Sequence, residues 1–333
     1  MKNIVVGLDV GGTSIKAGLF EGNRLVLREK RATPKQQGAQ GVLDHLTQTV
    51  WRLLEKAGAQ REDLRGVGLG VPGPVRGGVC LRAVNLGWEN LPVAKLLQEG
   101  MDCPVLIAND ANLAALGEAS AMERAPKNMV LVTLGTGIGA GLLQNGRILE
   151  GRHGLAGELG HMIMVPHGRR CTCGRSGCLE MYSSGRGLAQ NYSELKGEPM
   201  EVKDLMGPTN PLRQKALDKG ARMLAQALAN VANVVDPEVF VLGGGVMEGF
   251  PELLFMVRTH YERFALLKAK EIPVIRAQLG NEAGLYGALE LVLKNTPGPQ
   301  RFPGRPPIKR SRHKAGAAKR RSREPSSPPR PTD

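Results

Sequence analysis

Short apolar runs alternate with amphipathic stretches along most of this chain. The apolar runs are rich in Val, Ile and Leu and are four to eight residues long, which predicts buried β-strands. These predicted strands occupy residues 3–10, 65–71, 104–110, 128–134, 239–242 and 272–275. Apolar side chains three and four residues apart predict helices at 42–54, 111–125, 212–235 and 284–294. Strands that alternate with helices predict α/β domains with largely buried sheets.

One segment near the start of the chain recurs later. Residues 11–25 align without gaps on residues 134–148, and seven of the paired positions are identical. Each copy follows an apolar run and ends in a turn pair, Gly22-Asn23 or Asn145-Gly146, which indicates a hairpin. The offset of 123 residues is too long for the unit of a solenoid. We therefore expect two domains of related topology, each opening with a β-meander.

Length and charge agree with two domains and argue against a nucleic-acid binder. The 333 residues suit two domains of about 100–200 residues each. The net charge is +14, but residues 296–333 carry +9 of it and nine of the 22 prolines, which leaves +5 for the rest. A segment that is so basic and rich in proline buries too little apolar surface to offset the conformational entropy lost on folding. We therefore expect a disordered tail. Beyond non-specific contacts of this tail, no nucleic-acid partner is expected.

The five cysteines and the lengths of the apolar runs exclude other classes of protein. So few scattered cysteines do not make a disulfide-stapled scaffold, and no apolar run approaches the roughly 20 residues of a membrane span. Asp9 interrupts the first apolar run too early for a signal peptide. Cys80 and Cys103 are isolated and are expected to be buried as small apolar side chains. We expect a soluble, cytoplasmic protein.

Three predicted strands run directly into glycine-rich turns, at 9–13, 135–139 and 243–245. Glycine lets backbone N–H groups approach phosphate oxygens closely, so these turns are candidates for binding a nucleotide between two domains. Neither a Walker A motif nor a dinucleotide fingerprint is present.

Asp9 is an acid in a predicted strand, where acids are disfavoured. Its carboxylate either holds Mg²⁺ through water or bonds locally to the turn.

Cys171, Cys173 and Cys178 lie within eight residues of one another. In a reduced protein this spacing indicates a metal site more than a disulfide. Zinc prefers four tetrahedral ligands, and His161 and His167 are equal candidates for the fourth on position alone. Three thiolates and one imidazole would form a closed structural site, and free thiols in a loop are the alternative.

Acids near strand ends are candidates for chemistry. Asp110 lies at the end of the predicted strand 104–110, and α/β sheets bind ligands beyond the carboxyl ends of their strands. It is either the N-cap of the following helix or a catalytic base. Glu158 and Glu180 flank the cysteines, and their carboxylates can each accept two hydroxyl hydrogen bonds, as a polyhydroxyl ligand requires. Surface positions are the alternative for both.

Together these motifs resemble bacterial sugar kinases of the ROK family over about residues 3–294. The matching segments are LDVGGTSIK (8–16), GVPGPV (70–75), AVNLGW (83–88), NDAN (109–112), LGTGIGAG (134–141), GELGH (157–161), CTCGRSGCLE (171–180) and LGGGV (242–246). The resemblance implies a two-lobed, actin-like α/β fold related to ribonuclease H, with a cleft between the lobes. The implied lobes are 1–110, completed by a helix at about 283–294, and 111–282 with the zinc loop.

The resemblance also implies an activity. A family member of this type phosphorylates a hexose at the 6-hydroxyl with ATP, and glucose is the first expectation. A kinase for N-acetylglucosamine, N-acetylmannosamine or fructose is one alternative, and a non-catalytic, sugar-sensing transcriptional regulator is another. The presence of Asp9, Asp110 and the glycine turns argues against a pure sensor, because binding alone needs no base.

Roles follow from the resemblance residue by residue. The implied sugar-binding residues are Asn85, Asn109, Asp110, Glu158, His161 and Glu180, with Asp110 as the general base. The implied nucleotide-binding residues are Asp9, Gly11, Gly12, Thr13, Lys16, Gly135, Thr136, Gly137, Gly139, Gly243 and Gly244. The resemblance selects His161 as the fourth ligand of a structural Zn²⁺ with Cys171, Cys173 and Cys178, and Asp9 as the holder of Mg²⁺. The implied partners are a sugar, a nucleotide and further copies of the chain, in a dimer or tetramer.

Overall fold

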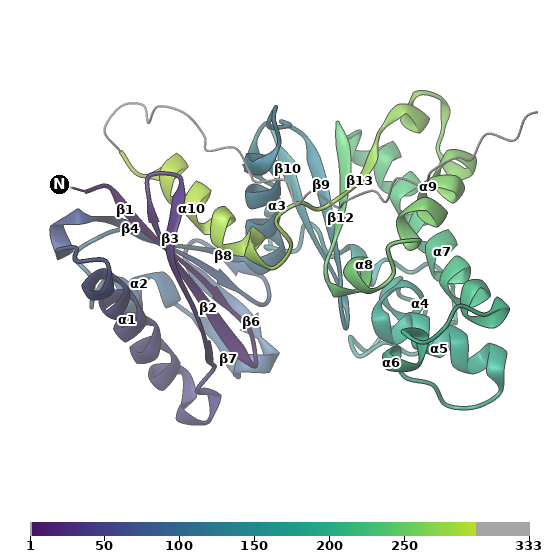
Figure 1. Ribbon diagram of the computed structural model, residues 1–333, viewed down its shortest axis with the longest axis horizontal. Helices are drawn as coiled ribbons and strands as arrows, with labels where there is room; N and C mark the ends of the chain where they lie inside the picture. Colours follow the sequence, from purple (N-terminus) through teal and green to yellow (C-terminus); the bar gives the residue numbers. More distant parts are fainter. Residues whose placement is uncertain (1, 298–333) are drawn as a thin grey trace, which may run out of the picture.

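The structure is a computed structural model that describes residues 2–297. Two five-stranded sheets form its centre, with helices beside and between them, as Figure 1 shows. The tail predicted at 296–333 lies outside the described residues except for its first two positions. Within residues 2–297 no helix combines the length and the apolar character that crossing a membrane requires.

The first sheet takes its strands from the first third of the chain. It contains β1 (Ile4–Val10), β2 (Ser14–Glu21), β3 (Arg24–Ala32), β4 (Leu64–Val71) and β8 (Val105–Asn109), in the order β3-β2-β1-β4-β8. β1, β2 and β3 are antiparallel neighbours, whereas β4 and β8 run parallel to β1. The predicted helix at 42–54 is confirmed as α1 (Gly38–Lys56), which buries Val42, Leu46 and Val50 in the same core as this sheet.

The second sheet repeats this arrangement. It contains β9 (Met129–Leu134), β10 (Ile138–Gln144), β11 (Arg147–Ile148), β12 (Val239–Gly243) and β13 (Val274–Arg276), in the order β11-β10-β9-β12-β13. Again the first three strands form an antiparallel meander, and the last two run parallel to the first. The internal repeat therefore reflects two sheets of the same topology, as predicted.

The remaining elements surround the two sheets. A small antiparallel sheet, which no apolar run indicated, consists of β5 (Val75–Arg76), β6 (Val79–Ala83) and β7 (Trp88–Leu91). The other helices beside the sheets are α2 (Val93–Gln98), α4 (Glu180–Ser183), α5 (Gly185–Lys196), α6 (Val202–Leu205), α7 (Pro211–Val235), α8 (Gly245–Gly249) and α9 (Leu253–Phe264). Turns of 3-10 helix occupy Lys35–Gln37, Arg61–Asp63, Val84–Leu86, Leu159–His161, Leu267–Glu271 and Gly280–Glu282. The long predicted helix at 212–235 is confirmed as α7, whose N-cap is Asn210.

Two helices lie side by side between the sheets: α3 (Asp110–Ala121) and α10 (Ala283–Asn295), as Figure 1 shows. They approach one another closely because glycines face the opposing backbone. A Cβ on Gly287 of α10 would overlap the carbonyl oxygen of Leu113, and one on Gly117 of α3 would overlap that of Ala283. We propose the lobes as 1–110 with the helix at 283–294, and 111–282, because each range then holds one five-stranded sheet.

Gly287→Ala is expected to lower the free energy of unfolding by about 3 kcal/mol, because the added methyl group has no space between α3 and α10. Urea unfolding followed by circular dichroism measures the effect. The matched control is Gly100→Ala, whose methyl group would meet Thr47 Cγ2 at an ordinary 3.6 Å. Equal unfolding midpoints for the two variants would contradict the close contact.

Candidate functional site

A cleft with a volume of about 1080 Å³ lies between the two five-stranded sheets. Its walls come from the carboxyl ends of β1, β8, β9 and β12 and from the loops that follow them. Open α/β sheets bind their ligands at such a position. The predicted site residues that line the cleft are Asp9, Lys16, Asn85, Asn109, Asp110, Gly135, Gly137, Gly139, Glu158, His161, Cys173, Glu180, Gly243 and Gly244.

Other residues of the predicted site are not in the cleft wall. They are Gly11, Gly12, Thr13, Thr136, Cys171 and Cys178. Gly12 packs against Asn85, whose Cβ would lie 2.8 Å from a methyl group on that glycine. The two cysteines are buried, at 3% and 0% exposed surface. The turn at 135–139 thus contributes directly to the cleft, whereas the turn at 11–13 lies behind a residue that does.

Asp110 is the first residue of α3, directly after β8. The helix cap is Asn109 instead, because its Oδ1 accepts hydrogen bonds from the N–H groups of Ala111 and Asn112 at 2.9 and 3.2 Å. Asn109 Nδ2 also donates to the carbonyl oxygen of Gly73 at 3.1 Å. Asp110 is exposed to the cleft, and one of its oxygens accepts from the N–H of Ala111 at 2.8 Å. The carboxylate of Asp110 is therefore not required for capping.

The surroundings of Asp110 raise its pKa from 3.8 to about 6. Desolvation is the largest cause: the side chain opens into the cleft, but protein atoms of the walls replace much of the water around it. The negative charge of Asp9, and to a smaller extent that of Glu158, raises the pKa further, whereas hydrogen bonds from Ala111 and Asn109 lower it. Such a carboxylate is ionised at neutral pH and is basic enough to accept a proton.

Asp9 lies near Asp110 in the same wall. Its Oδ2 forms an ion pair with Lys16 Nζ at 3.2 Å, and Lys16 Nζ also donates to the carbonyl oxygen of Asn281 at 3.4 Å. A Cβ on Gly70 would lie 3.6 Å from Asp9 Oδ1 and 3.7 Å from the Cα of Asp110, so the two acids flank one glycine. Two neighbouring carboxylates offer the oxygen ligands that Mg²⁺ prefers.

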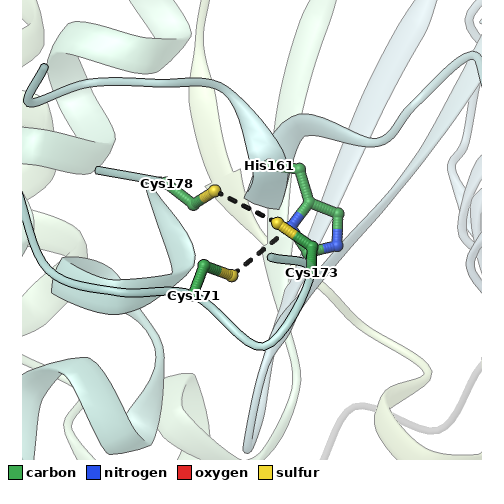
Figure 2. A group of neighbouring side chains, drawn as sticks. All are labelled: His161, Cys171, Cys173 and Cys178. Atoms are coloured by element: carbon green, nitrogen blue, oxygen red, sulfur yellow. Dashed lines mark hydrogen bonds between the residues drawn. The ribbon is translucent and has the colours of Figure 1, made fainter. Parts of the chain in front are cut away.

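Figure 2 shows four side chains that point toward one another: His161, Cys171, Cys173 and Cys178. One potential ligand atom of each lies within 4.8 Å of the others. Cys171 Sγ is 3.8 Å from His161 Nδ1, and Cys173 Sγ is 3.6 Å from Cys178 Sγ. His167, an equal candidate on sequence position alone, is not part of this group.

These distances fit a tetrahedral metal ion. A zinc–sulfur bond of about 2.3 Å implies ligand atoms about 3.8 Å apart. Three thiolates and one imidazole would fill all four positions, which is the composition of a structural site. Gly177 makes the tight loop possible, because its φ is +84° and a Cβ there would overlap the carbonyl oxygen of Val165.

His161, a member of this cluster, and Glu180, which lies against it, both line the cleft. Cys171 Sγ lies 4.0 Å from Glu180 Oε1, and the other carboxylate oxygen of Glu180 accepts a hydrogen bond from the N–H of Ile138 at 3.1 Å. His161 turns Nδ1 to the thiols, while its Nε2 lies 4.0 Å from Glu158 Oε2. The loop that holds the four ligand atoms therefore also orients His161 and Glu180 at the cleft wall.

The structure adds charged and loop residues that the sequence patterns did not indicate. They are Arg82, Glu118, Glu248, Gly280, Asn281 and Gly284. Glu118 is 1% exposed, and its carboxylate accepts hydrogen bonds from the N–H groups of Gln278 and Leu279 at 2.7 and 2.9 Å. A single acid within the otherwise apolar helix segment 113–119 was a signal that could have been used. Gly284 begins the predicted helix at 284–294, and the other four lie outside the motifs and periodic segments.

Comparisons with known proteins assign the chain to a family. It is 38% identical over 310 residues to a glucokinase of Halalkalibacterium halodurans, covering 86% of this chain and 94% of the relative. It is 33% identical over 289 residues to an N-acetylmannosamine kinase of Escherichia coli, covering 85% and 96%. The crystal structure of a ROK family glucokinase from Streptomyces griseus, in complex with glucose and AMPPNP, matches with a TM-score of 0.72 and 31% identity, covering 87% and 99%. Because residues 5–295 also match the ROK family profile, this chain belongs to the ROK family.

Proposed function

We propose that this protein is a sugar kinase that transfers the γ-phosphoryl group of ATP to the 6-hydroxyl of a hexose, with glucose as the preferred acceptor. The observation that carries the proposal is Asp110, a carboxylate of raised pKa that opens into a large cleft at the end of a parallel strand. The glucokinase relatives, at 38% and 33% identity, support glucose. The AMPPNP in the Streptomyces griseus structure supports ATP as the donor.

Asp110 acts as the general base in this proposal. As the oxygen of the sugar hydroxyl forms a bond to the γ-phosphorus, the bond from that phosphorus to the bridging oxygen of ADP breaks, and the hydroxyl proton moves to Asp110. The other cleft residues contribute mainly by position, because phosphoryl transfer depends on alignment and on charge neutralisation. Asn109 holds the start of α3, and with it Asp110, in place through its cap.

The sugar and the nucleotide would occupy different parts of the cleft. Asn85, Asn109, Glu158, His161 and Glu180 would bind hydroxyl groups of the sugar together with Asp110. The residues proposed for the nucleotide are Asp9, Gly11, Gly12, Thr13, Lys16, Gly135, Thr136, Gly137, Gly139, Gly243 and Gly244. Gly11, Gly12, Thr13 and Thr136 would have to approach the phosphates from outside the present wall, for example as the lobes close and exclude water.

Two metal ions are proposed. His161, Cys171, Cys173 and Cys178 would hold a structural Zn²⁺, because their ligand atoms have the separations that a tetrahedral ion needs. Asp9 would hold Mg²⁺ through water, and this ion would neutralise part of the phosphate charge. The zinc has no open position for a reacting group, so its contribution is to orient His161 and Glu180.

A kinase for a different sugar is the second candidate, because an N-acetylmannosamine kinase of Escherichia coli is also 33% identical to this chain. A sugar-sensing regulator is less well supported, since the regulator among the similar structures is only 23% identical and shows the fold alone.

We also propose a cytoplasmic location, consistent with free cysteines throughout the described chain. A homodimer or tetramer would cover the exposed apolar side chains of Phe255, Leu266 and Leu267.

A substrate panel tests the reaction and the sugar together. The full-length protein with ATP, Mg²⁺ and Zn²⁺ is offered glucose, glucosamine, N-acetylglucosamine, N-acetylmannosamine and fructose, and ADP release is measured. We expect kcat/KM for glucose to exceed every other value by about tenfold or more. A higher kcat/KM for an N-acetylated sugar would show a different sugar specificity but would still support the kinase function. No turnover on any sugar would overturn the enzymatic function.

A further inference from the structure

The cleft contains an acid that the proposed reaction does not use. Glu248 on α8 lines the cleft near Gly243 and Gly244, and its side chain is exposed. Its carboxylate has no hydrogen-bond or ion-pair partner among residues 2–297. We propose that Glu248 binds the ribose hydroxyls of the nucleotide and so selects ribonucleotides over deoxyribonucleotides. This inference rests on the proposed kinase function.

Other acids in the cleft already have partners. Asp9 is paired with Lys16, and Glu118 accepts hydrogen bonds from two backbone N–H groups. Glu180 accepts one from the turn at 135–139. Glu248, in contrast, lies beside the proposed nucleotide-binding glycines with both oxygens free to accept hydrogen bonds from a ligand.

Short contacts connect Glu248 to the proposed phosphate region. Lys16 Nζ is 3.2 Å from Asp9 Oδ2 and 3.4 Å from the carbonyl oxygen of Asn281. Gly280 precedes Asn281, and a Cβ there would lie 3.3 Å from Glu248 Oε1. Glu248 therefore lies beside the same loop that Lys16 contacts. In ATP, the ribose is likewise the neighbour of the phosphates.

The loop beside Glu248 is fixed before any ligand binds. The buried carboxylate of Glu118 accepts hydrogen bonds from Gln278 and Leu279, and one from the N–H of Gly280 as well. Gly280 has a φ of +52°, a conformation that favours glycine, so the loop passes close to Glu248 without a side chain between them. A preorganised wall loses less conformational entropy when the ligand binds.

The chemistry of a carboxylate suits this ligand. Ionised carboxylates only accept hydrogen bonds, and their two oxygens can accept from the neighbouring 2′- and 3′-hydroxyls of a ribose. A deoxyribose lacks one of these donors, so one of the two hydrogen bonds between the ligand and Glu248 is lost. We therefore expect ATP to be preferred over either deoxy analogue by about tenfold.

The experiment measures kcat/KM for ATP, 2′-deoxy-ATP and 3′-deoxy-ATP at a saturating concentration of the preferred sugar. Glu248→Ala is expected to lower kcat/KM for ATP by more than about tenfold and to lower the values for the deoxy analogues by a smaller factor, because each analogue keeps one of the two hydroxyls. The KM of the sugar should stay unchanged. Glu248→Gln, which keeps one acceptor oxygen, should lie between. Glu262→Gln on α9, an exposed acid outside the cleft, is the matched control and should behave as wild type.

Three outcomes overturn the ribose assignment: no preference for ATP in the wild type, the same preference in Glu248→Ala, or an equal loss with all three nucleotides. The last would mean a structural role for Glu248. Failure of the kinase function is recognised separately, because wild-type protein would then phosphorylate no sugar and would bind no ATP in calorimetry. Thermal melting of each variant shows that the comparison is made on folded protein.

Discussion

Replacement of Asp110 with Asn is expected to lower kcat by about 10²- to 10⁴-fold while glucose still binds with nearly wild-type affinity. The amide has the size of the carboxylate but cannot take the proton of the attacking hydroxyl. The fold around it should persist, since Asn109 rather than Asp110 caps α3. Steady-state kinetics measure the loss of turnover, and calorimetry with glucose measures binding. Near-normal turnover would exclude Asp110 as the base.

The same substitution should stabilise the folded protein at neutral pH. Because the folded state raises the pKa of Asp110 from 3.8 to about 6, the ionised carboxylate destabilises the fold above that pH. The amide of the variant carries no charge to desolvate and none to repel Asp9, so the melting temperature should rise. Well below pH 3.8 Asp110 is protonated in both the folded and the unfolded state, and the contribution of its charge to the difference should vanish. A stabilised but inactive variant would separate catalysis from folding.

The pH dependence of the wild-type protein gives an independent check. If Asp110 must be ionised to accept the proton, kcat/KM should be constant above pH 7 and fall about tenfold per pH unit well below pH 6. The midpoint of the fall reports the pKa in the free protein. A profile that stays flat down to pH 4.5 would contradict the raised pKa.

Cys178→Ala is expected to abolish zinc binding and to raise the KM for glucose by about 10- to 100-fold. Removal of one thiolate leaves three ligands, and the loop would then lose the proposed zinc ion and with it the proposed restraint on His161 and Glu180 at the cleft wall. Structural zinc contributes roughly 10–16 kcal/mol in small zinc-binding peptides, so the melting temperature should fall as well. The KM for ATP should change far less, because no cysteine of this cluster is proposed to contact the nucleotide.

Metal analysis of the purified protein and steady-state kinetics measure these effects. Cys103→Ala is the matched control: this cysteine is also buried, at 7% exposed surface, but lies outside the cluster. It should keep one zinc ion per chain and the wild-type KM for glucose. A wild-type protein without zinc, or a Cys178→Ala variant with an unchanged KM for glucose, would refute the proposed role of the metal.

Several features were readable from the chain because they depend on neighbours in the sequence. The apolar spacing of 42–54 and of 212–235 corresponds to α1 and α7, since helical periodicity requires only local side chains. The paired segments 11–25 and 134–148 predicted the two sheets of equal topology. The small sheet β5-β6-β7 was missed, because strands of two to five residues are too short to show a period.

The residues of the site also divide into those that local sequence motifs indicate and those whose role depends on distant segments. Asp110 and the cysteine cluster stand in recognisable local motifs and were found. Whether Asn109 or Asp110 caps α3 could not be read from two adjacent polar residues, since both types favour that position. Glu118 and Glu248 were not identified, because their significance depends on a loop near residue 280 that is distant in the sequence.

The sequence by itself determined the α/β class, the repeated meander, the glycine turns, the cluster of three cysteines and the candidate base, because each is encoded in the order and spacing of nearby residues. Only the tertiary structure decided which of these groups share one cleft, and it brings His161, which the family resemblance had selected over His167, to the thiols. It also decided that Asp110 has a pKa near 6 and that Glu248 is left without a partner among the described residues. The physical reason is that burial, electrostatic repulsion and hydrogen-bond partners depend on the distances between segments that folding brings together.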